Sequence, residues 1–142
     1  MLYGIGCDLC EVARMEKSLT GTHAAAFVRR VFGPEEQAAL GFGGDSPLLP
    51  EGRSRTHRAA SAAADFAAKE AFLKAAGTGL AAPFSFCEIE AVRLPSGAPV
   101  YRFSGKTAEW VTEHQLKAQL SLSHDGGMAM AFCVLEHLVP ET

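Results

Sequence analysis

Residues 56–77, THRAASAAADFAAKEAFLKAAG, contain ten alanines between Ala59 and Ala76. Alanine has the highest helix propensity, and a glycine such as Gly77 commonly ends a helix. The stretch therefore predicts a long helix from about Thr56 to Ala76. Because so many of its side chains are small, another element is expected to pack very close to the backbone of this helix.

The segments around this helix predict a mixed order of strands and helices. Strands are expected where apolar residues alternate or run together, at residues 1–9, 86–94, 100–103, 119–123 and 128–135. Shorter helices are expected where apolar residues recur with helical spacing, at residues 11–19, 27–32, 34–41 and 106–116. The two late hairpins predict an α+β fold in which an antiparallel sheet packs against the long Ala-rich helix. With 142 residues, the chain is expected to form a single domain over residues 1–142.

The composition is that of an ordinary globular protein, with 48% hydrophobic and 20% charged residues. The formal net charge of −3 argues against a general nucleic-acid binder, whose domain is usually strongly basic. The N-terminus lacks the features of a secretory signal, and the longest apolar run, residues 128–135, is far shorter than the ~20 residues that span a bilayer. The four irregularly spaced cysteines do not suggest a disulfide scaffold. A cytoplasmic protein without a membrane or nucleic-acid partner is therefore expected.

Basic side chains are unevenly distributed along the chain. Between positions 14 and 30 only one acidic residue accompanies four basic ones, which are Arg14, Lys17, Arg29 and Arg30. Residues 81–142 hold four basic and seven acidic side chains. An anionic partner is therefore expected to bind the first half of the chain, and a solvated helix face is the alternative explanation.

Glu70 is the first candidate for chemistry, because it lies four residues after Phe66 and three before Leu73 on the predicted helix. This spacing places its carboxylate on an apolar stripe, where a carboxylate needs a partner. Lys74 can supply one through an ordinary i, i+4 ion pair. Spacing alone favours this ion pair slightly over a metal or catalytic role.

Asp8 is the second candidate, because it lies at the end of an apolar strand where the chain is expected to turn. Sites are commonly assembled where strands end in loops, and capping of the following helix is the alternative. Two isolated carboxylates with a nearby lysine suit Mg²⁺, which usually keeps several waters and takes one or two protein carboxylates plus substrate phosphates.

The third candidate is the segment Ser121-Leu122-Ser123-His124-Asp125, at the tip of a predicted hairpin. Strand alternation places Ser121 and Ser123 on the polar face, and it points adjacent side chains to opposite faces. Ser123, His124 and Asp125 therefore cannot form a hydrolase triad with one another. Hydroxyl, imidazole and backbone N–H groups at such a tip suit a phosphate or a nucleotide base, while ordinary hairpin polarity is the alternative.

Residues 7–10, Cys7-Asp8-Leu9-Cys10, have C-x-x-C spacing. A redox dithiol needs a stabilised thiolate, and the Asp8 carboxylate between the two cysteines opposes one. A zinc site needs two further ligands at recognisable spacing, which Cys87 and Cys133 do not provide. A redox or zinc protein is therefore a minor alternative. The histidines most simply explained as facing solvent are His23, His57, His114 and His137.

Taken together, these segments resemble the holo-acyl-carrier-protein synthase family of 4′-phosphopantetheinyl transferases over nearly the whole chain. The matching motifs are Gly4-Ile5-Gly6-x-Asp8-x-x-Glu11, Phe27-x-x-Arg30-x-Phe32 with Glu36, Phe66-Ala67-x-Lys69-Glu70-Ala71-x-x-Lys74-Ala75-x-Gly77-Thr78-Gly79, Gly97-x-Pro99, Gly105-x-x-Ala108 and Ser121-x-Ser123-His124. One such motif would be weak, whereas the ordered set is highly specific.

The resemblance implies transfer of the phosphopantetheine arm of coenzyme A to a serine of an acyl carrier protein, with release of adenosine 3′,5′-bisphosphate. It implies that Asp8 and Glu70 bind Mg²⁺ together with the coenzyme A pyrophosphate, and that Lys74 contacts the phosphates. A metal that neutralises and positions a diphosphate suits such a reaction. The base that removes the serine proton is left open among Glu70, Lys69 and a metal-bound water.

The resemblance also implies a homotrimer whose sites lie between protomers. Ser123 and His124, with Gly97 and Pro99, are then expected to contact coenzyme A. The basic residues between positions 14 and 30 are interpreted as the docking surface for an acidic carrier protein, with Arg14 as the strongest candidate.

Two features depart from the family pattern. The family commonly has an arginine just before the Phe-Ala-x-Lys-Glu signature, where this chain has Asp65, and this puts one phosphate contact in question. The candidates to replace it are Arg53, Arg55 and Arg58. The loop of residues 41–55 is also longer and richer in Gly and Pro than expected, and it is a candidate for adapting the protein to a particular carrier.

The sequence thus predicts a Mg²⁺-dependent phosphopantetheinyl transferase. A non-catalytic coenzyme A or carrier-protein binding module is the alternative from another class. The presence of Asp8, Glu70 and Lys74 speaks against that alternative.

Overall fold

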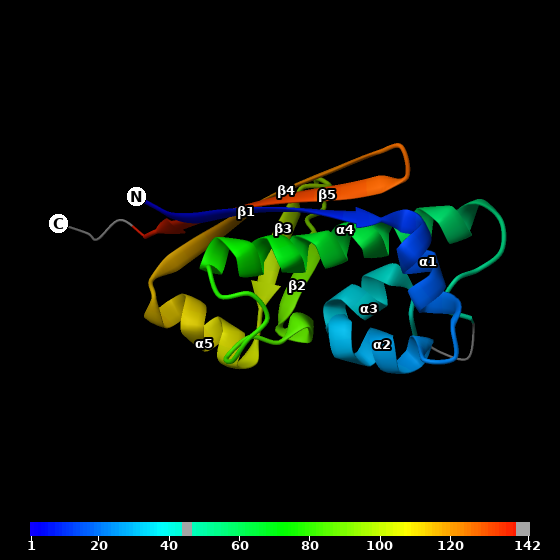
Figure 1. Cartoon of the computed structure of the whole chain (residues 1–142), viewed down its shortest axis with the longest axis horizontal. Helices are drawn as coiled ribbons and strands as arrows, with labels where there is room; N and C mark the ends of the chain where they lie inside the picture. The colour runs from blue at the N-terminus through cyan, green and yellow to red at the C-terminus, as the bar shows by residue number, and fades with distance from the viewer. Residues whose placement is uncertain (44–46, 139–142) are drawn as a thin grey trace.

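The computed structural model describes residues 1–43 and 47–138. Its elements follow the order β1 (Leu2–Glu11), α1 (Val12–Thr20), α2 (Ala24–Val31), α3 (Pro34–Leu40), α4 (Arg53–Ala76), β2 (Ile89–Arg93), β3 (Pro99–Phe103), α5 (Gly105–Glu113), β4 (Leu116–Asp125) and β5 (Met128–His137). A short 3-10 turn, Phe86–Glu88, precedes β2. Figure 1 shows α4 along the middle of the molecule, with the long strands on one side and α1 to α3 gathered at one end.

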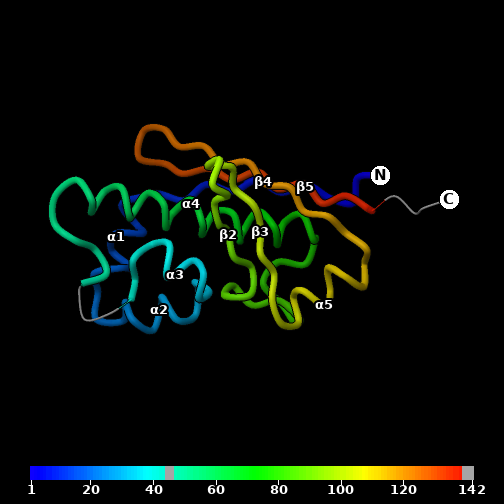
Figure 2. Tube along the Cα trace, turned by 180° about the vertical axis from the view of Figure 1, so that it is seen from behind, coloured from blue at the N-terminus to red at the C-terminus, as the bar shows by residue number. Residues whose placement is uncertain are grey.

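Strands β1, β5 and β4 form an antiparallel three-stranded sheet in that order, and β2 and β3 form a separate antiparallel hairpin. The three-stranded sheet packs against α4, and β2 and β3 lie on another side of this helix, as the reverse view in Figure 2 illustrates. The predicted α+β class, with an antiparallel sheet on the long Ala-rich helix, is confirmed.

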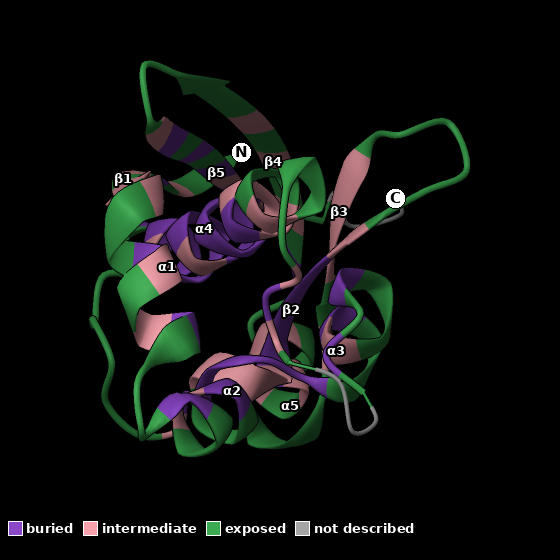
Figure 3. Cartoon of the chain, turned by 90° about the vertical axis from the view of Figure 1, so that its right-hand side faces the viewer, coloured by how far each residue is buried: buried purple, intermediate pink, exposed green. Residues whose placement is uncertain are grey.

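Helix α4 approaches β1 closely because both surfaces lack bulk. A Cβ atom placed on Gly4 or on Gly6 would collide with the backbone carbonyl oxygen of Ala75 or of Ala71, respectively. Most of the alanines of α4 are almost fully buried, and Figure 3 shows buried stretches along this helix. This confirms the expectation that another element packs against the backbone of the Ala-rich helix.

The apolar core has two parts along α4. The C-terminal half of this helix packs with Phe84, Ile89 and the inner side chains of β5, while its N-terminal half packs with α1, α2 and α3 through residues such as Met15 and Phe32. Each half of α4 is therefore covered by a different set of elements, and Lys69 lies near the point where the two sets meet.

Several element boundaries differ from those predicted. Helix α4 begins at Arg53, three residues before the predicted start. The loop expected over residues 41–55 therefore ends at residue 52. Residues 44–46 of that loop lie outside the described residues. The strand predicted from residue 86 begins at Ile89, because residues 86–88 form the 3-10 turn.

The face of the three-stranded sheet that points away from α4 carries exposed apolar side chains. The most exposed are Leu2 at 58%, Ile5 at 55% and Leu9 at 58%, and the exposed residues Met130 and Phe132 of β5 lie on the same face. Apolar side chains grouped in this way mark an interaction surface more often than a solvated one. Within residues 1–43 and 47–138, no helix has the length and apolar character needed to cross a membrane.

Candidate active site at the edge between β1 and α4

Asp8, Glu70 and Lys74 meet where the edge strand β1 packs against α4, and we call these three residues the β1–α4 edge. Asp8 is paired with Ala131 inside the sheet and lies three residues before the end of β1, so the prediction that it sits at the turn is wrong. Its side chain points to the α4 side of the sheet, like the buried Ala131 beside it. The N-cap of α1 is Glu11, which excludes the alternative that Asp8 caps this helix.

Lys74 binds across the two elements. Its Nζ atom lies 3.0 Å from Asp8 Oδ1 and donates a second hydrogen bond to the backbone carbonyl of Cys7, also at 3.0 Å. Lys74 does not form the i, i+4 ion pair with Glu70 that helix spacing favoured; its ion pair is with Asp8. Lys74 therefore ties the helix to the strand through Asp8.

The Glu70 carboxylate is half-buried and has no ion-pair partner within the described part of the chain. Burial raises the pKa of Glu70, the charge of Asp8 raises it further, and Lys74 lowers it. The pKa of Lys74 is raised, chiefly by its hydrogen bond to Asp8. Two carboxylates that destabilise each other's negative charge form an arrangement that a cation would relieve.

The donor set at this edge fits a hard divalent cation that brings most of its own ligands. Two carboxylates suit Mg²⁺, which is held by one or two protein carboxylates together with waters and phosphates. No cluster of three or more His, Cys, Asp or Glu side chains suited to a metal occurs in the ranges 1–43 and 47–138. A closed all-protein cage such as a structural zinc site is thus not found among these residues.

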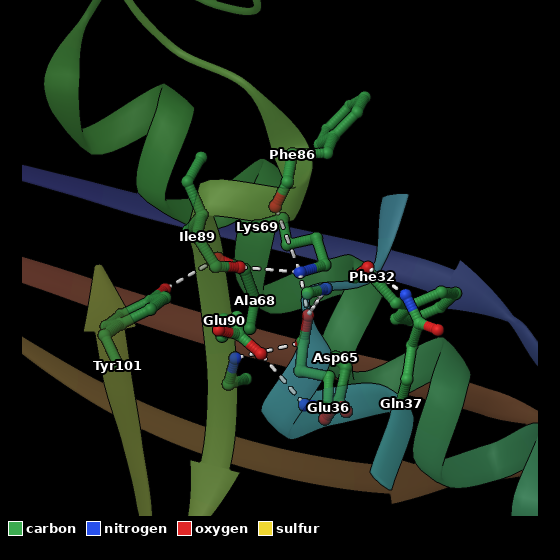
Figure 4. Close-up of polar contacts among 12 residues, drawn as sticks. Phe32, Glu36, Gln37, Asp65, Ala68, Lys69, Phe86, Ile89, Glu90 and Tyr101 are labelled. Carbon is green, nitrogen blue, oxygen red and sulfur yellow. Dashed lines mark hydrogen bonds and ion pairs between the residues drawn. The ribbon is translucent and has the colours of Figure 1, made fainter. Parts of the chain in front are cut away.

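Lys69, named above as one candidate base, is not at this edge. Its side chain is fully buried and forms an ion pair with Glu36, and its Nζ atom also donates to the carbonyl oxygens of Ile89 at 2.6 Å and Phe86 at 3.2 Å (Figure 4). All three protons of the ammonium group are therefore used. This geometry removes Lys69 from the candidate bases.

Glu36 and Glu90 complete a buried charged cluster around Lys69. Glu36 accepts hydrogen bonds from the backbone N–H groups of Gly33 and Ala91, and Glu90 accepts one from the backbone N–H of Glu36 at 2.9 Å. Burial raises the pKa of Glu36 to about 7, against the opposing effect of Lys69. Sequence reasoning listed Glu36 only within a motif and missed Glu90, because nothing local marks Glu36 as the partner of Lys69 or Glu90 as the acceptor of the Glu36 N–H.

Asp65, the residue that departs from the family pattern, is buried and forms an ion pair with Arg93 of β2, with Nη1 and Oδ1 2.7 Å apart. Burial raises the pKa of Asp65 to about 6 even though Arg93 opposes this shift. The pair lies at a cavity of about 390 Å³ that Arg102 also lines. Arg93 was not among the arginines proposed from the sequence to compensate for Asp65.

The three arginines that were proposed lie at the N-terminal end of α4. Arg58 donates to the carbonyl oxygens of Leu48 and Gly41, and Arg55 lies 3.8 Å from a Glu16 carboxylate oxygen. Arg53 and Arg58 line a cavity of about 460 Å³ next to the one beside Asp65. No described contact of these arginines reaches the β1–α4 edge.

Ser123 and His124 lie on β4, which is the opposite edge of the sheet from β1. Their side chains point to opposite faces, and His124 shares the α4-facing side with Asp8. Because β5 lies between, two strand spacings of about 4.8 Å separate the backbones of β1 and β4. Gly97 and Pro99 belong to the β2–β3 hairpin, whose strand β3 contacts β4. Within one chain all four residues therefore lie on elements other than β1 and α4.

The basic residues form a third group, the basic cluster, on α1 and α2. Its members, Arg14, Lys17, Arg29 and Arg30, are all exposed. Lys17 and Arg30 line a cavity of about 460 Å³ whose wall includes Phe27. Positive charge around an apolar hollow suits a partner that presents acidic and apolar side chains together.

The C-x-x-C spacing does not create a thiol site. Cys7 is exposed and Cys10 is half-buried, and both thiols are free, as are those of Cys87 and Cys133. Burial raises the pKa of Cys10 to about 11, and the charge of Asp8 adds to this effect. His23, His57, His114 and His137 are exposed, as expected.

Comparison with known proteins assigns this chain to a family. Residues 4–133 match the family model described as the 4′-phosphopantetheinyl transferase superfamily. The holo-[acyl-carrier-protein] synthase of Ralstonia nicotianae is 36% identical over 135 residues, which cover 95% of this chain and 92% of that protein. The chain belongs to the 4′-phosphopantetheinyl transferase superfamily.

Among solved structures, the chain is similar to holo-[acyl-carrier-protein] synthases. The holo-[acyl-carrier-protein] synthase of Neisseria meningitidis aligns with a TM-score of 0.74 and 30% identity, covering 96% of this chain and 99% of that one. The Bacillus anthracis synthase in complex with CoA (3′,5′-ADP) aligns with a TM-score of 0.70 and 32% identity, covering 97% and 99%. The chain therefore resembles holo-[acyl-carrier-protein] synthases along nearly its whole length.

Proposed function

We propose that this protein transfers the 4′-phosphopantetheine group of coenzyme A to a serine of apo acyl carrier protein and releases adenosine 3′,5′-bisphosphate. The observation that carries the proposal is the β1–α4 edge, where Asp8, Glu70 and Lys74 of two separate motifs meet. The relatives and the coenzyme A complex named above support the same activity.

Asp8 and Glu70 are the residues that would hold Mg²⁺. When bound, the metal neutralises the charge of the coenzyme A diphosphate and holds it in place, which is the main requirement of phosphoryl transfer. The raised pKa of Glu70 supports this assignment, because a cation relieves the repulsion between Glu70 and Asp8.

Lys74 is the residue that would contact the phosphates of coenzyme A. Its side chain is 54% exposed at the edge, and its ammonium group carries one proton beyond the two hydrogen bonds that it makes. With Lys69 removed, Glu70 is the side-chain candidate for the base that takes the serine proton. A raised pKa makes a carboxylate a stronger base, which favours this role.

The working assembly is a homotrimer in which two copies complete each site. Two features support this. Ser123, His124, Gly97 and Pro99 lie on elements other than β1 and α4 within one chain, and the sheet face that holds Ile5 and Phe132 leaves apolar side chains exposed. Packing of that face against another copy would bury it and bring the group on β4 and the β2–β3 hairpin to a neighbour's β1–α4 edge, where it would contact coenzyme A.

The basic cluster is the docking surface for the acidic carrier protein, with Arg14 as its main contact. Exposure of all four side chains and the hollow beside Phe27 support this role. The four free thiols fit a reducing cytoplasm, and the range 1–142 is taken as one domain.

The decisive experiment incubates the protein with coenzyme A, Mg²⁺ and an apo acyl carrier protein, and then measures the mass of the carrier. A gain equal to one phosphopantetheine group, lost when the metal is chelated, is expected. A protein that binds coenzyme A or the carrier without any mass gain, tested with several carriers, would instead be the non-catalytic binding module. Light scattering of the same sample gives the oligomeric state, and a fully active monomer would refute the shared site.

A further inference from the structure

The ammonium group of Lys74 occupies the position beside Asp8 that a metal ion would take. Its ammonium group binds Asp8 Oδ1 at 3.0 Å, so one of the two carboxylates at the β1–α4 edge already has a cationic partner. Glu70 has none within the described residues. In this state Lys74 neutralises the charge of Asp8, and the charge of Glu70 is not neutralised by an ion pair among the described residues.

A divalent cation and Lys74 cannot both neutralise Asp8 without cost. Mg²⁺ sits about 2.1 Å from its oxygen ligands, and an ammonium group 3.0 Å from the same carboxylate oxygen would lie close enough to repel it strongly. Binding of the metal at Asp8 Oδ1 therefore favours a position of Lys74 away from this oxygen. The side chain can move away, because 54% of it is exposed and its other contact is a single carbonyl oxygen, that of Cys7.

The displaced ammonium group needs a new anionic partner, and a diphosphate provides one. Lys74 lies on the same edge as the metal candidates, so phosphate oxygens brought to Asp8 and Glu70 are within the region that its long side chain reaches. Metal binding would free Lys74 for the phosphates, and phosphate binding would free Asp8 for the metal. By linkage the two effects are equal and reciprocal.

We propose that Lys74 is an internal cation that competes with Mg²⁺ for Asp8 in the free enzyme and that couples metal binding to coenzyme A binding by moving to the diphosphate. The proposal rests on the metal site and substrate proposed above and adds a second role to Lys74. It predicts weak binding of metal to the free protein and stronger binding once coenzyme A is present.

The test is calorimetric titration of Mg²⁺ into the intact protein without carrier, so that no transfer occurs, with and without saturating coenzyme A. Lys74→Met is expected to bind Mg²⁺ alone about two- to fivefold more tightly than the wild type, the range given by a partly exposed ion pair. In the presence of coenzyme A this advantage is expected to disappear, because Lys74 has then left Asp8 in the wild type too. Binding of Mg²⁺ to coenzyme A itself is measured separately and subtracted.

Two further variants control the interpretation. Lys74→Arg keeps a cation at Asp8 and should bind Mg²⁺ alone as weakly as the wild type. Lys106→Met removes the same charge from an exposed position on α5 and should leave the metal affinity unchanged. Melting temperatures show that each variant is folded.

The outcomes separate the inference from the proposed function. If the wild type binds Mg²⁺ and modifies the carrier, but Lys74→Met binds the metal alone no more tightly than the wild type, the competition is refuted and the function stands. An advantage of Lys74→Met that persists unchanged with coenzyme A refutes the coupling. If neither protein binds Mg²⁺ even with coenzyme A, the metal assignment and the inference both fail.

Discussion

Lys69 and Lys74 stand five residues apart on the same helix, and the protein uses them in opposite ways. Lys69 is fully buried and satisfied by Glu36 and two carbonyl oxygens, whereas Lys74 is 54% exposed and holds Asp8 through a pair that solvent reaches. Five residues correspond to about 140° around an α-helix, so the two side chains leave α4 in different directions. The buried charged cluster fixes the arrangement of α3, α4 and β2, while the β1–α4 edge keeps its charges available for a ligand.

The largest effect is expected from Glu70→Gln, which removes a negative charge from the β1–α4 edge. If Glu70 holds the metal, transfer to the carrier should fall about a thousandfold or more, because charge stabilisation by a bound metal is worth several kcal/mol. The melting temperature should change little, since Glu70 has no described ion-pair partner to lose. Initial rates followed by carrier mass check the first expectation and calorimetry the second.

Glu113→Gln, at an exposed position of α5, is the matched control and should retain wild-type rates. Full activity in Glu70→Gln would show that the β1–α4 edge does not hold the metal.

Lys69→Met tests how much the buried charged cluster contributes to stability. Removal of one partner of a buried ion pair leaves the Glu36 carboxylate without its cation, and the free energy of unfolding should fall by about 3–5 kcal/mol. Urea titration of Lys69→Met beside Lys106→Met measures this loss, and the control should lie within about 0.5 kcal/mol of the wild type.

The double variant Lys69→Met, Glu36→Gln should recover part of the stability, because it no longer buries an unpaired Glu36 carboxylate. A Lys69→Met variant as stable as the wild type would mean that the buried charged cluster does not hold α3 and β2 on α4.

Asp65 should give the buried region an unusual pH dependence. Burial raises its pKa to about 6 from an ordinary 3.8, so between about pH 4 and pH 6 the folded protein retains a proton that the unfolded chain releases. The contribution of Asp65 to stability therefore decreases as pH rises through this window, by up to about 3 kcal/mol. Unfolding free energies of the wild type and Asp65→Asn at pH 4 and pH 6.5 measure it.

Asp65→Asn cannot titrate, and the difference in stability between this variant and the wild type should shift in the variant's favour as pH rises. A difference that is constant with pH, or that shifts the other way, would show that Arg93 keeps Asp65 ionised throughout.

The smallest effect is expected from Arg14→Glu, in the basic cluster on α1. Charge reversal at the proposed docking surface should raise KM for the carrier about tenfold and leave KM for coenzyme A within about twofold. Steady-state kinetics with each substrate varied in turn separate the two constants. Equal effects on both would show that the basic cluster does not act as a carrier-specific surface.

Prediction from the sequence succeeded where the signal is local. The Ala-rich stretch and Gly77 predicted α4 and its end, and the Gly-Gly turn with flanking apolar residues predicted the β4–β5 hairpin. The start of α4 was misplaced by three residues because Arg53 follows a Gly-rich loop without a capping side chain. The placement of Asp8 at a turn was wrong because β1 continues to Glu11 by pairing with β5, a partner more than a hundred residues away.

The candidate site was predicted in its residue types and only partly in its contacts. Asp8, Glu70 and Lys74 were singled out together, yet the pairing of Lys74 with Asp8 instead of Glu70 depends on how closely β1 approaches α4. Arg93 could not have been predicted as the partner of Asp65, because the two residues are 28 positions apart and meet only when β2 lies on α4.

The sequence by itself determined the long helix, the class of fold and the charges that its faces carry, since helical propensity and periodicity act over a few neighbouring residues. The tertiary structure decided which of those charges became buried. Helix periodicity determines the direction in which a side chain leaves α4. Only the elements that pack on that side of α4 determine whether the side chain meets a carboxylate, a carbonyl oxygen or water. For this reason Lys69 and Lys74, two identical side chains that leave the same helix in different directions, became a buried cation and a solvent-exposed one.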